Sequence, residues 1–285
     1  MGKILLFGIS LLSLTAFFML PAQVDDFILL TPPSADFVIR GTVLIRYQGT
    51  DEHIAIPPIV TSIGIEAFAG NRDFPIGVAL PTSITAIGHR SFANARALRY
   101  VNIPTSVTSI GNYAFFGARN LSNIVIPSSV TSIGDFAFAR CSSLTRVTIS
   151  GAITSIGNGT FQDCSNLTSI TIPGTVTTIG NYAFAGCASL ASIPLPSSIT
   201  TIGMRAFAGC TGLTSVVIPP SVTFIGERAF MGCTNLERIN IPPSVISIGE
   251  RAFEGCTNLR TVTISRRTQI GRYAFPEGAQ IIYSD

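Results

Sequence analysis

Tryptophan is absent from this sequence of 285 residues, and its single lysine is Lys3. Charged residues make up 12% of the chain, whereas an average soluble domain has roughly 25%. The formal net charge of +3 is too small to indicate a nucleic-acid partner. Apolar residues nevertheless reach 47%, which is too many for a disordered chain. The composition therefore predicts a folded protein whose surface is built largely from hydroxyl and amide groups.

Residue types that carry catalysis are also scarce. The two histidines are His53 and His89, and a solvated turn explains the cluster Asp51, Glu52 and His53 better than a fragment of a catalytic triad does. The 15 carboxylates are scattered, without a pair spaced to face one cleft, and no phosphate-binding or dinucleotide-binding glycine motif occurs. We therefore expect no catalytic residues, no cofactor and no metal ligands, and an enzyme is the least favoured function class.

The longest apolar run lies at the start of the chain, where Lys3 precedes an apolar stretch over residues 4–20. Ala22 suits a cleavage site, although Leu20 is larger than the small residue usually found two positions earlier. We predict a signal peptide over residues 1–22 and hence an exported protein in the periplasm, on the cell surface or secreted. An uncleaved anchor and a buried structural helix remain alternatives, and no later run predicts a transmembrane segment.

An internal repeat dominates the rest of the sequence. The spacing between successive Ile-Gly pairs is 23 residues in seven consecutive steps, with a first step of 24 and a last step of 22. The ten pairs begin at Ile63, Ile87, Ile110, Ile133, Ile156, Ile179, Ile202, Ile225, Ile248 and Ile270. Phenylalanine and leucine columns keep the same spacing. A fixed period of this length indicates a solenoid in which stacked units bury one another's apolar side chains.

One unit, starting at Leu213, shows the expected local structure. Val216 and Ile218 alternate with outward residues as in a short half-buried strand, and Pro219 ends that strand because it has no N–H to donate. Phe230 follows a glycine turn and is expected in one helical turn or 3₁₀ segment on the convex side, where irregular strands are also expected. The strands of successive units are expected to pair in parallel at about 4.8 Å and to form a sheet on the concave side.

The pattern Leu-x-x-Val-x-Ile-Pro-x-Ser-Val-Thr-x-Ile-Gly-x-x-Ala-Phe-x-Gly-Cys resembles the BspA-type, or treponemal, leucine-rich repeats, and the resemblance covers roughly residues 36–285. It implies a right-handed leucine-rich-repeat solenoid. Residues 23–56 are expected to contain a lead-in and a β-hairpin cap around Gly41, and residues 57–285 ten repeats that end in a covering strand at 280–283. Proteins of this family are typically surface adhesins, so the resemblance also implies attachment to host proteins.

Six cysteines occupy one column of successive repeats: Cys141, Cys164, Cys187, Cys210, Cys233 and Cys256. An even number of cysteines in an exported chain normally indicates disulfides. Here stacking places neighbouring Cβ atoms about 4.8 Å apart, wider than the roughly 3.8 Å of a disulfide. Alanine fills the column at Ala95 and Ala118. We therefore predict six free thiols that pack as small buried apolar groups.

The remaining candidates for function are surface residues. Strand positions that flank the buried valines and isoleucines are predicted to form an outward strip on the concave face, and this strip is the candidate partner-binding surface. Its members are Tyr100, Asn102, Asn123, Val125, Arg146, Thr148, Ser169, Thr171, Ser192, Ser215, Val217, Arg238 and Asn240. These residue types also suit exposed strands that bind nothing.

A second row follows the Ile-Gly pairs. Tyr113, Phe136 and Tyr182 are expected to form an exposed apolar patch for a partner or for self-association. At the same position in later repeats, Arg228 and Arg251 lie beside glutamates and are better explained as a solvated ladder of charges.

Together these features favour a non-enzymatic binding protein that recognises a protein, or a glycan, through the solenoid surface. An extracellular-matrix or plasma protein of a host is the partner that the family resemblance implies. The alternative is a structural scaffold that assembles with its own copies into a homo-oligomer.

Overall fold

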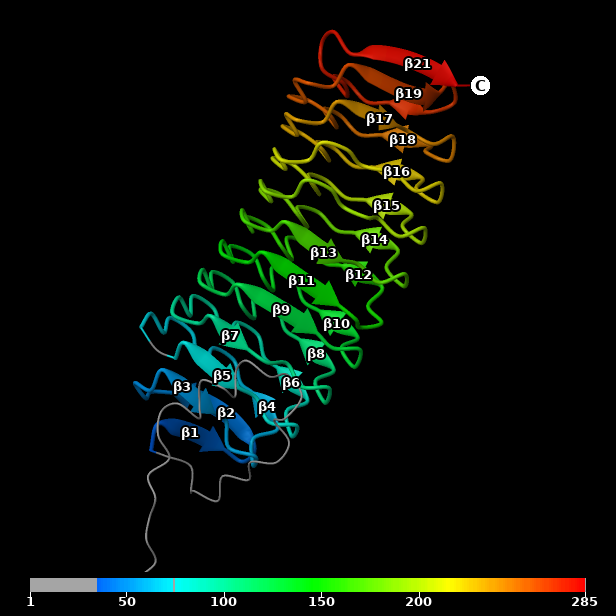
Figure 1. The fold of residues 1–285 in the computed structure, drawn as a ribbon. Helices are drawn as coiled ribbons and strands as arrows, with labels where there is room; N and C mark the ends of the chain where they lie inside the picture. The colour runs from blue at the N-terminus through cyan, green and yellow to red at the C-terminus, as the bar shows by residue number, and fades with distance from the viewer. Residues whose placement is uncertain (1–34, 74, 285) are drawn as a thin grey trace, which may run out of the picture.

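The computed structural model describes residues 35–73 and 75–284. These residues form a β-solenoid whose repeats stack along one axis, so the predicted fold is confirmed (Figure 1). The predicted signal peptide lies outside the described residues. Each repeat contributes up to two strands that pair in parallel with the same strands of its neighbours.

The first series of strands comes from the Leu-x-x-Val-x-Ile segments. Its members are β3 (His53–Ala55), β5 (Gly77–Ala79), β7 (Tyr100–Val101), β9 (Asn123–Ile126), β11 (Arg146–Ile149), β13 (Ser169–Thr171), β17 (Arg238–Asn240), β19 (Thr261–Ser265) and β21 (Gln280–Ser284). They form three sheets, β3-β5-β7, β9-β11-β13 and β17-β19-β21. Between β13 and β17 the series is interrupted where Pro194 stands at a strand position, because proline has no N–H to donate to the ladder.

The second series consists of two-residue strands just before each glycine of the Ile-Gly pairs. They are β4 (Ser62–Ile63), β6 (Ala86–Ile87), β8 (Ser109–Ile110), β10 (Ser132–Ile133), β12 (Ser155–Ile156), β14 (Thr178–Ile179), β15 (Thr201–Ile202), β16 (Phe224–Ile225), β18 (Ser247–Ile248) and β20 (Gln269–Ile270). The ladder runs without a break from β2 to β10 and again from β12 to β20. The sequence predicted irregular strands besides the main sheet but not where each one lies, because two residues are too few to show alternation.

The first repeat is covered by an antiparallel hairpin of β1 (Phe37–Arg40) and β2 (Val43–Tyr47). Gly41 at its turn has φ of +61°, a conformation that costs glycine little. β2 pairs in parallel with β4, and Tyr47 places its ring 5.6 Å from that of Phe68. The hairpin thus continues both the ladder and the aromatic column of the repeats.

The core consists of columns of identical residues. Nine phenylalanines, from Phe68 to Phe253, are fully buried at one position of successive repeats. Neighbouring rings are stacked with centroids between 4.7 and 5.6 Å apart. Leucine, valine and isoleucine columns surround them in one continuous cluster. No repeat buries its apolar side chains alone, which is why the fold requires several repeats.

The expected helical turn at Phe230 is wrong. In its place the chain makes successive turns, and the residue two positions before the phenylalanine adopts a left-handed conformation in every repeat. In the unit quoted above that residue is Arg228, with φ of 54°, and Gly232 adds a second left-handed residue at 72°. Two left-handed residues within five positions exclude a helix. The turn instead bonds across repeats, for example from Phe230 N–H to the carbonyl of Ala252 at 2.7 Å.

Candidate binding surface

The outward strip lies on the first series of strands. Its side chains are exposed except for Thr148, which is half-buried, while Val147 and its equivalents between them are buried. Alternation along short strands thus places one outward residue on each side of every buried residue. Val217 is 80% exposed and Val125 is 62% exposed, so the polar strip also offers apolar contacts.

Some polar groups of the strip are already used within the fold. The Asn102 side chain accepts a hydrogen bond from Leu80 N–H at 2.7 Å and donates to the Leu80 carbonyl at 3.1 Å. Asn123 accepts a hydrogen bond from the Thr145 hydroxyl at 3.1 Å. These two amides therefore brace neighbouring repeats, and the side chains of Arg146 and Arg238 are better placed to meet a partner.

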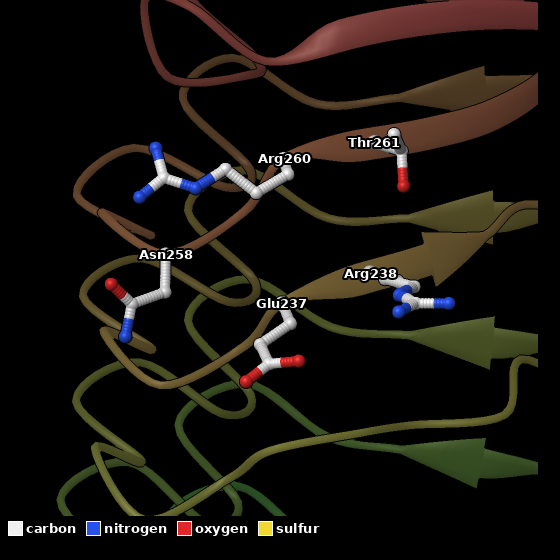
Figure 2. Close-up of a pocket in the computed structure, with 5 residues that line it drawn as sticks. All are labelled: Glu237, Arg238, Asn258, Arg260 and Thr261. Atoms are coloured by element: carbon white, nitrogen blue, oxygen red, sulfur yellow. The ribbon is translucent and has the colours of Figure 1, made fainter.

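A depression of about 550 Å³ lies at the C-terminal end of the strip. Figure 2 shows that its residues come from two adjacent repeats, with Arg238 and Thr261 on strands β17 and β19 and the others toward the turns that precede them. Its lining consists of Glu237, Arg238, Asn258, Arg260 and Thr261. Arg238 and Thr261 face each other across the sheet in register.

The two arginines of this depression, Arg238 and Arg260, have no ion pair among the residues that the structure describes. Some arginine side chains elsewhere are engaged, for example Arg140 with Asp163 at 3.7 Å and Arg205 over the Tyr182 ring at 5.6 Å. Two unpaired guanidinium groups beside one carboxylate can donate hydrogen bonds to a carboxylate group of a partner. Glu237, Asn258 and Arg260 were not predicted from the sequence, although Glu237 adjoins the predicted strip residue Arg238.

The prediction of an exposed aromatic patch is wrong, because its three side chains are not fully exposed. Tyr113, Phe136 and Tyr182 are half-buried, because they lie against neighbours of the same row. The rings of Tyr113 and Phe136 stack at 5.1 Å with 9° between their planes, and Arg205 covers Tyr182. In the later repeats Arg228 pairs with Glu227, and Arg251 lies 3.5 Å from Glu250, as expected for a charged ladder.

The cysteine column is confirmed as six free, buried thiols. Each Sγ–H donates to the phenylalanine carbonyl of the preceding repeat, as from Cys141 to Phe115 at 3.1 Å. Burial raises the pKa of the Cys141 and Cys210 thiols to about 12. These thiols are therefore protonated and unreactive at neutral pH. Within residues 35–73 and 75–284, no group of histidine, cysteine or acidic residues is arranged to hold a metal ion.

None of the segments that the structure describes forms a helix of the length and apolar character needed to cross a bilayer.

Comparison with known proteins gives a family match. The model of the BspA type leucine rich repeat region matches residues 47–168 and 154–281, in six copies. No curated protein matches the sequence.

Solved structures share the fold. A leucine rich cell surface protein from Faecalibacterium prausnitzii is 23% identical with a TM-score of 0.51, over 90% of this chain and 94% of that protein. The leucine-rich-repeat protein of T. pallidum is 26% identical with a TM-score of 0.51, over 80% and 90%. A leucine-rich repeat protein from Eubacterium ventriosum is 27% identical with a TM-score of 0.51, over 67% of this chain and 46% of that protein.

Proposed function

The chain belongs to the BspA-type leucine-rich-repeat family, and from this membership we propose that it is an exported protein that binds another protein through the outward strip. The observation that carries the proposal is the length of the strip. From Tyr100 to Asn240 it spans seven successive repeats, five of which form a strand there, so six steps of about 4.8 Å give a length on the order of 30 Å. An extended segment of a partner fits such a surface better than a small molecule does.

The strip combines three kinds of contact. Its hydroxyl groups offer many modest hydrogen bonds and little charge to desolvate, while Val125 and Val217 offer apolar anchors. Arg146 in the middle and Arg238 at the end supply charge-assisted hydrogen bonds to carboxylates. We therefore expect a partner that carries acidic and apolar side chains, and a protein of the host extracellular matrix or plasma is the first candidate.

The test is a binding screen of residues 23–285 against purified matrix and plasma proteins, with the double variant Arg146→Glu/Val217→Asp. Its control is Arg272→Glu/Ile246→Asp, which makes the same kind of changes at exposed positions outside the strip. Loss of at least tenfold in affinity for the strip variant alone is expected. Equal affinities in both variants would move the partner to another face.

Self-assembly is the second candidate. β21 is the terminal strand of its sheet, and Ile282 and Tyr283 on it are 45% and 46% exposed. An edge strand with exposed apolar side chains is a template for pairing with another chain. Failure of every partner in the screen, together with a dimer or larger species in light scattering, would favour the scaffold function. Cell fractionation with external protease would then separate a periplasmic location from the cell surface.

A further inference from the structure

A second depression, of about 510 Å³, lies on the turns of the first three repeats. It is separate from the outward strip, because its residues follow the second series of strands β4, β6 and β8 and precede the next strands of the first series. Its size is within the range of small-molecule sites. We propose that this depression, called here the turn depression, binds a neutral pyranose unit of a saccharide.

The floor of the turn depression is made from small residues, Ala69, Gly70 and Ala93. The column that holds Ala69 and Ala93 continues with Phe116 and then returns to alanine at Ala139. Phe116 is therefore a single large ring standing beside a floor of small residues. It is half-buried and no core packing of the neighbouring repeats requires it, since alanine serves there.

The two faces of the Phe116 ring have different surroundings. The Arg140 guanidinium lies over the ring at 5.3 Å and is itself held 3.7 Å from Asp163. Arg140 is not part of the lining, whereas Phe116 is, so the ring separates Arg140 from the turn depression. Tyr113 supports the ring from its edge, with centroids 5.7 Å apart and 66° between the planes. The wall is thus fixed before any ligand arrives, which lowers the entropy cost of binding.

Polar groups surround the floor. Arg90 lies 3.5 Å from Glu66, and both side chains are about half exposed, at 51% and 53%. Arg90 also lies over the Tyr113 ring at 5.5 Å, which sets the orientation of its guanidinium. The Asn94 carboxamide lies against Gly117, where an added Cβ would come within 2.6 Å of its Oδ1. Donors and acceptors therefore alternate around an apolar floor.

The backbone of this rim is left-handed at four residues that are not glycine. Glu66, Arg90, Asn94 and Tyr113 have φ between 52° and 58°. Gly159 occupies the same position as Glu66, Arg90 and Tyr113 in a later repeat, so the fold accepts glycine there. The same left-handed turn recurs in every repeat, so it sets where the side chains of Glu66, Arg90 and Tyr113 project and is not peculiar to the turn depression.

Saccharides match this combination. A pyranose ring presents an apolar face of C–H groups that packs on an aromatic ring, and its hydroxyl groups both donate and accept hydrogen bonds. The charges of Arg90 and Glu66 cancel, which favours a neutral sugar over an anion. An apolar side chain of a protein partner would cover Arg90, Glu66 and Asn94 without giving them hydrogen bonds, so it fits less well.

The experiment is saturation-transfer NMR and calorimetry with maltotriose, cellotriose, chitotriose and mannotriose on the protein lacking residues 1–22. We expect at least one of these trisaccharides to bind, and Phe116→Ala, which restores the alanine column, to weaken it at least tenfold. Tyr273→Ala removes a more exposed aromatic residue, 71% exposed, outside the turn depression and should leave binding unchanged.

Three outcomes would overturn the proposal: no trisaccharide binds, Phe116→Ala binds as well as the wild type, or only an apolar peptide competes for the site. The strip variant Arg146→Glu/Val217→Asp distinguishes this site from the proposed function. It should lose the protein partner and keep the saccharide, and Phe116→Ala should do the reverse.

Discussion

The phenylalanine column shows what a single residue contributes to this solenoid. Phe184 is fully buried, and its ring is stacked between those of Phe161 at 5.5 Å and Phe207 at 5.4 Å. Two aromatic neighbours on opposite faces leave no room for the surroundings to collapse when one ring is removed. The loss at this position therefore includes both the transfer of the ring and the cavity that it leaves.

Phe184→Ala is expected to lower the free energy of unfolding by about 3–5 kcal/mol. Urea denaturation followed by circular dichroism measures this change. Because the loss falls in the middle of the stack, it should also broaden the transition as the two halves begin to unfold separately. A loss below about 1 kcal/mol would contradict the stacked column.

Removal of a buried hydroxyl group should change the free energy of unfolding in the opposite direction. Ser91 is fully buried in a column that is otherwise mostly alanine, and its Oγ has no hydrogen-bond partner within residues 35–73 and 75–284. Ser91→Ala should raise the free energy of unfolding by roughly 1 kcal/mol, because an unpaired buried polar group is costly. Thr160 holds the same column position but donates to the Gly157 carbonyl at 3.0 Å, so Thr160→Ala is the control and should not stabilise. Thermal unfolding of the two variants decides the comparison.

At the scale of the element, the turn after each Ile-Gly pair is the feature that differs most from expectation. Sequence rules assign left-handed positions to glycine or asparagine, whereas here Arg228 and Tyr113 occupy them. Because these residues are not glycine or asparagine, the sequence does not indicate a left-handed turn, and the apolar spacing suggests a helical turn instead. Only the register between repeats, which supplies the cross-repeat hydrogen bonds, explains why the left-handed form persists.

Other features were predictable from the sequence only where they do not depend on how adjacent repeats align. Burial columns and the outward placement of Val217 were predictable, because strand alternation depends on the sequence alone. The convergence of Arg238 and Arg260 in one depression was not, because it depends on how adjacent repeats align. The turn depression did have a signal in the sequence, because Phe116 stands between Ala93 and Ala139 in its column.

Gly159 provides the test of the turn. Its φ is +57°, and a Cβ added there would overlap the ring of Phe136. Gly159→Ala should therefore lower the free energy of unfolding by about 1–3 kcal/mol, from backbone strain and displacement of the ring. Gly174→Ala is the matched control, since nothing lies within 4 Å of its added Cβ and its φ is not positive. Equal stability of the two variants in chemical denaturation would show that the turn rearranges freely.

At the scale of the whole molecule, the two strand ladders are interrupted at different junctions. The first series is broken between β7 and β9 and between β13 and β17, while the second is broken between β10 and β12. Where the second series is broken, between β10 and β12, hydrogen bonds between the turns still cross the junction, as from Phe138 N–H to the Thr160 carbonyl at 2.9 Å. Every junction thus keeps a continuous set of backbone hydrogen bonds, so the stack holds together without disulfides.

The cysteine column makes the free energy of unfolding fall at alkaline pH. An unfolded thiol ionises near its ordinary pKa of 9.0, while the folded Cys141 and Cys210 ionise at about 12. Their contribution is complete below pH 9 and is lost as the pH rises toward 12, because only the unfolded chain releases the protons. At pH 10.5 the loss is about 2 kcal/mol for each thiol. Cys141→Ala/Cys210→Ala should lose less stability between pH 7.5 and 10.5, and denaturation at both pH values measures this; an equal loss would contradict the assignment.

The direction of the ladders has a mechanical consequence. Because backbone hydrogen bonds join each repeat to the next along the long axis, tension between the two ends acts on all junctions in series, and each junction yields separately instead of many being sheared together (Figure 1). Each repeat that yields releases 23 residues, or about 75 Å of extended chain. A protein pulled at both ends would therefore lengthen in discrete steps of this size.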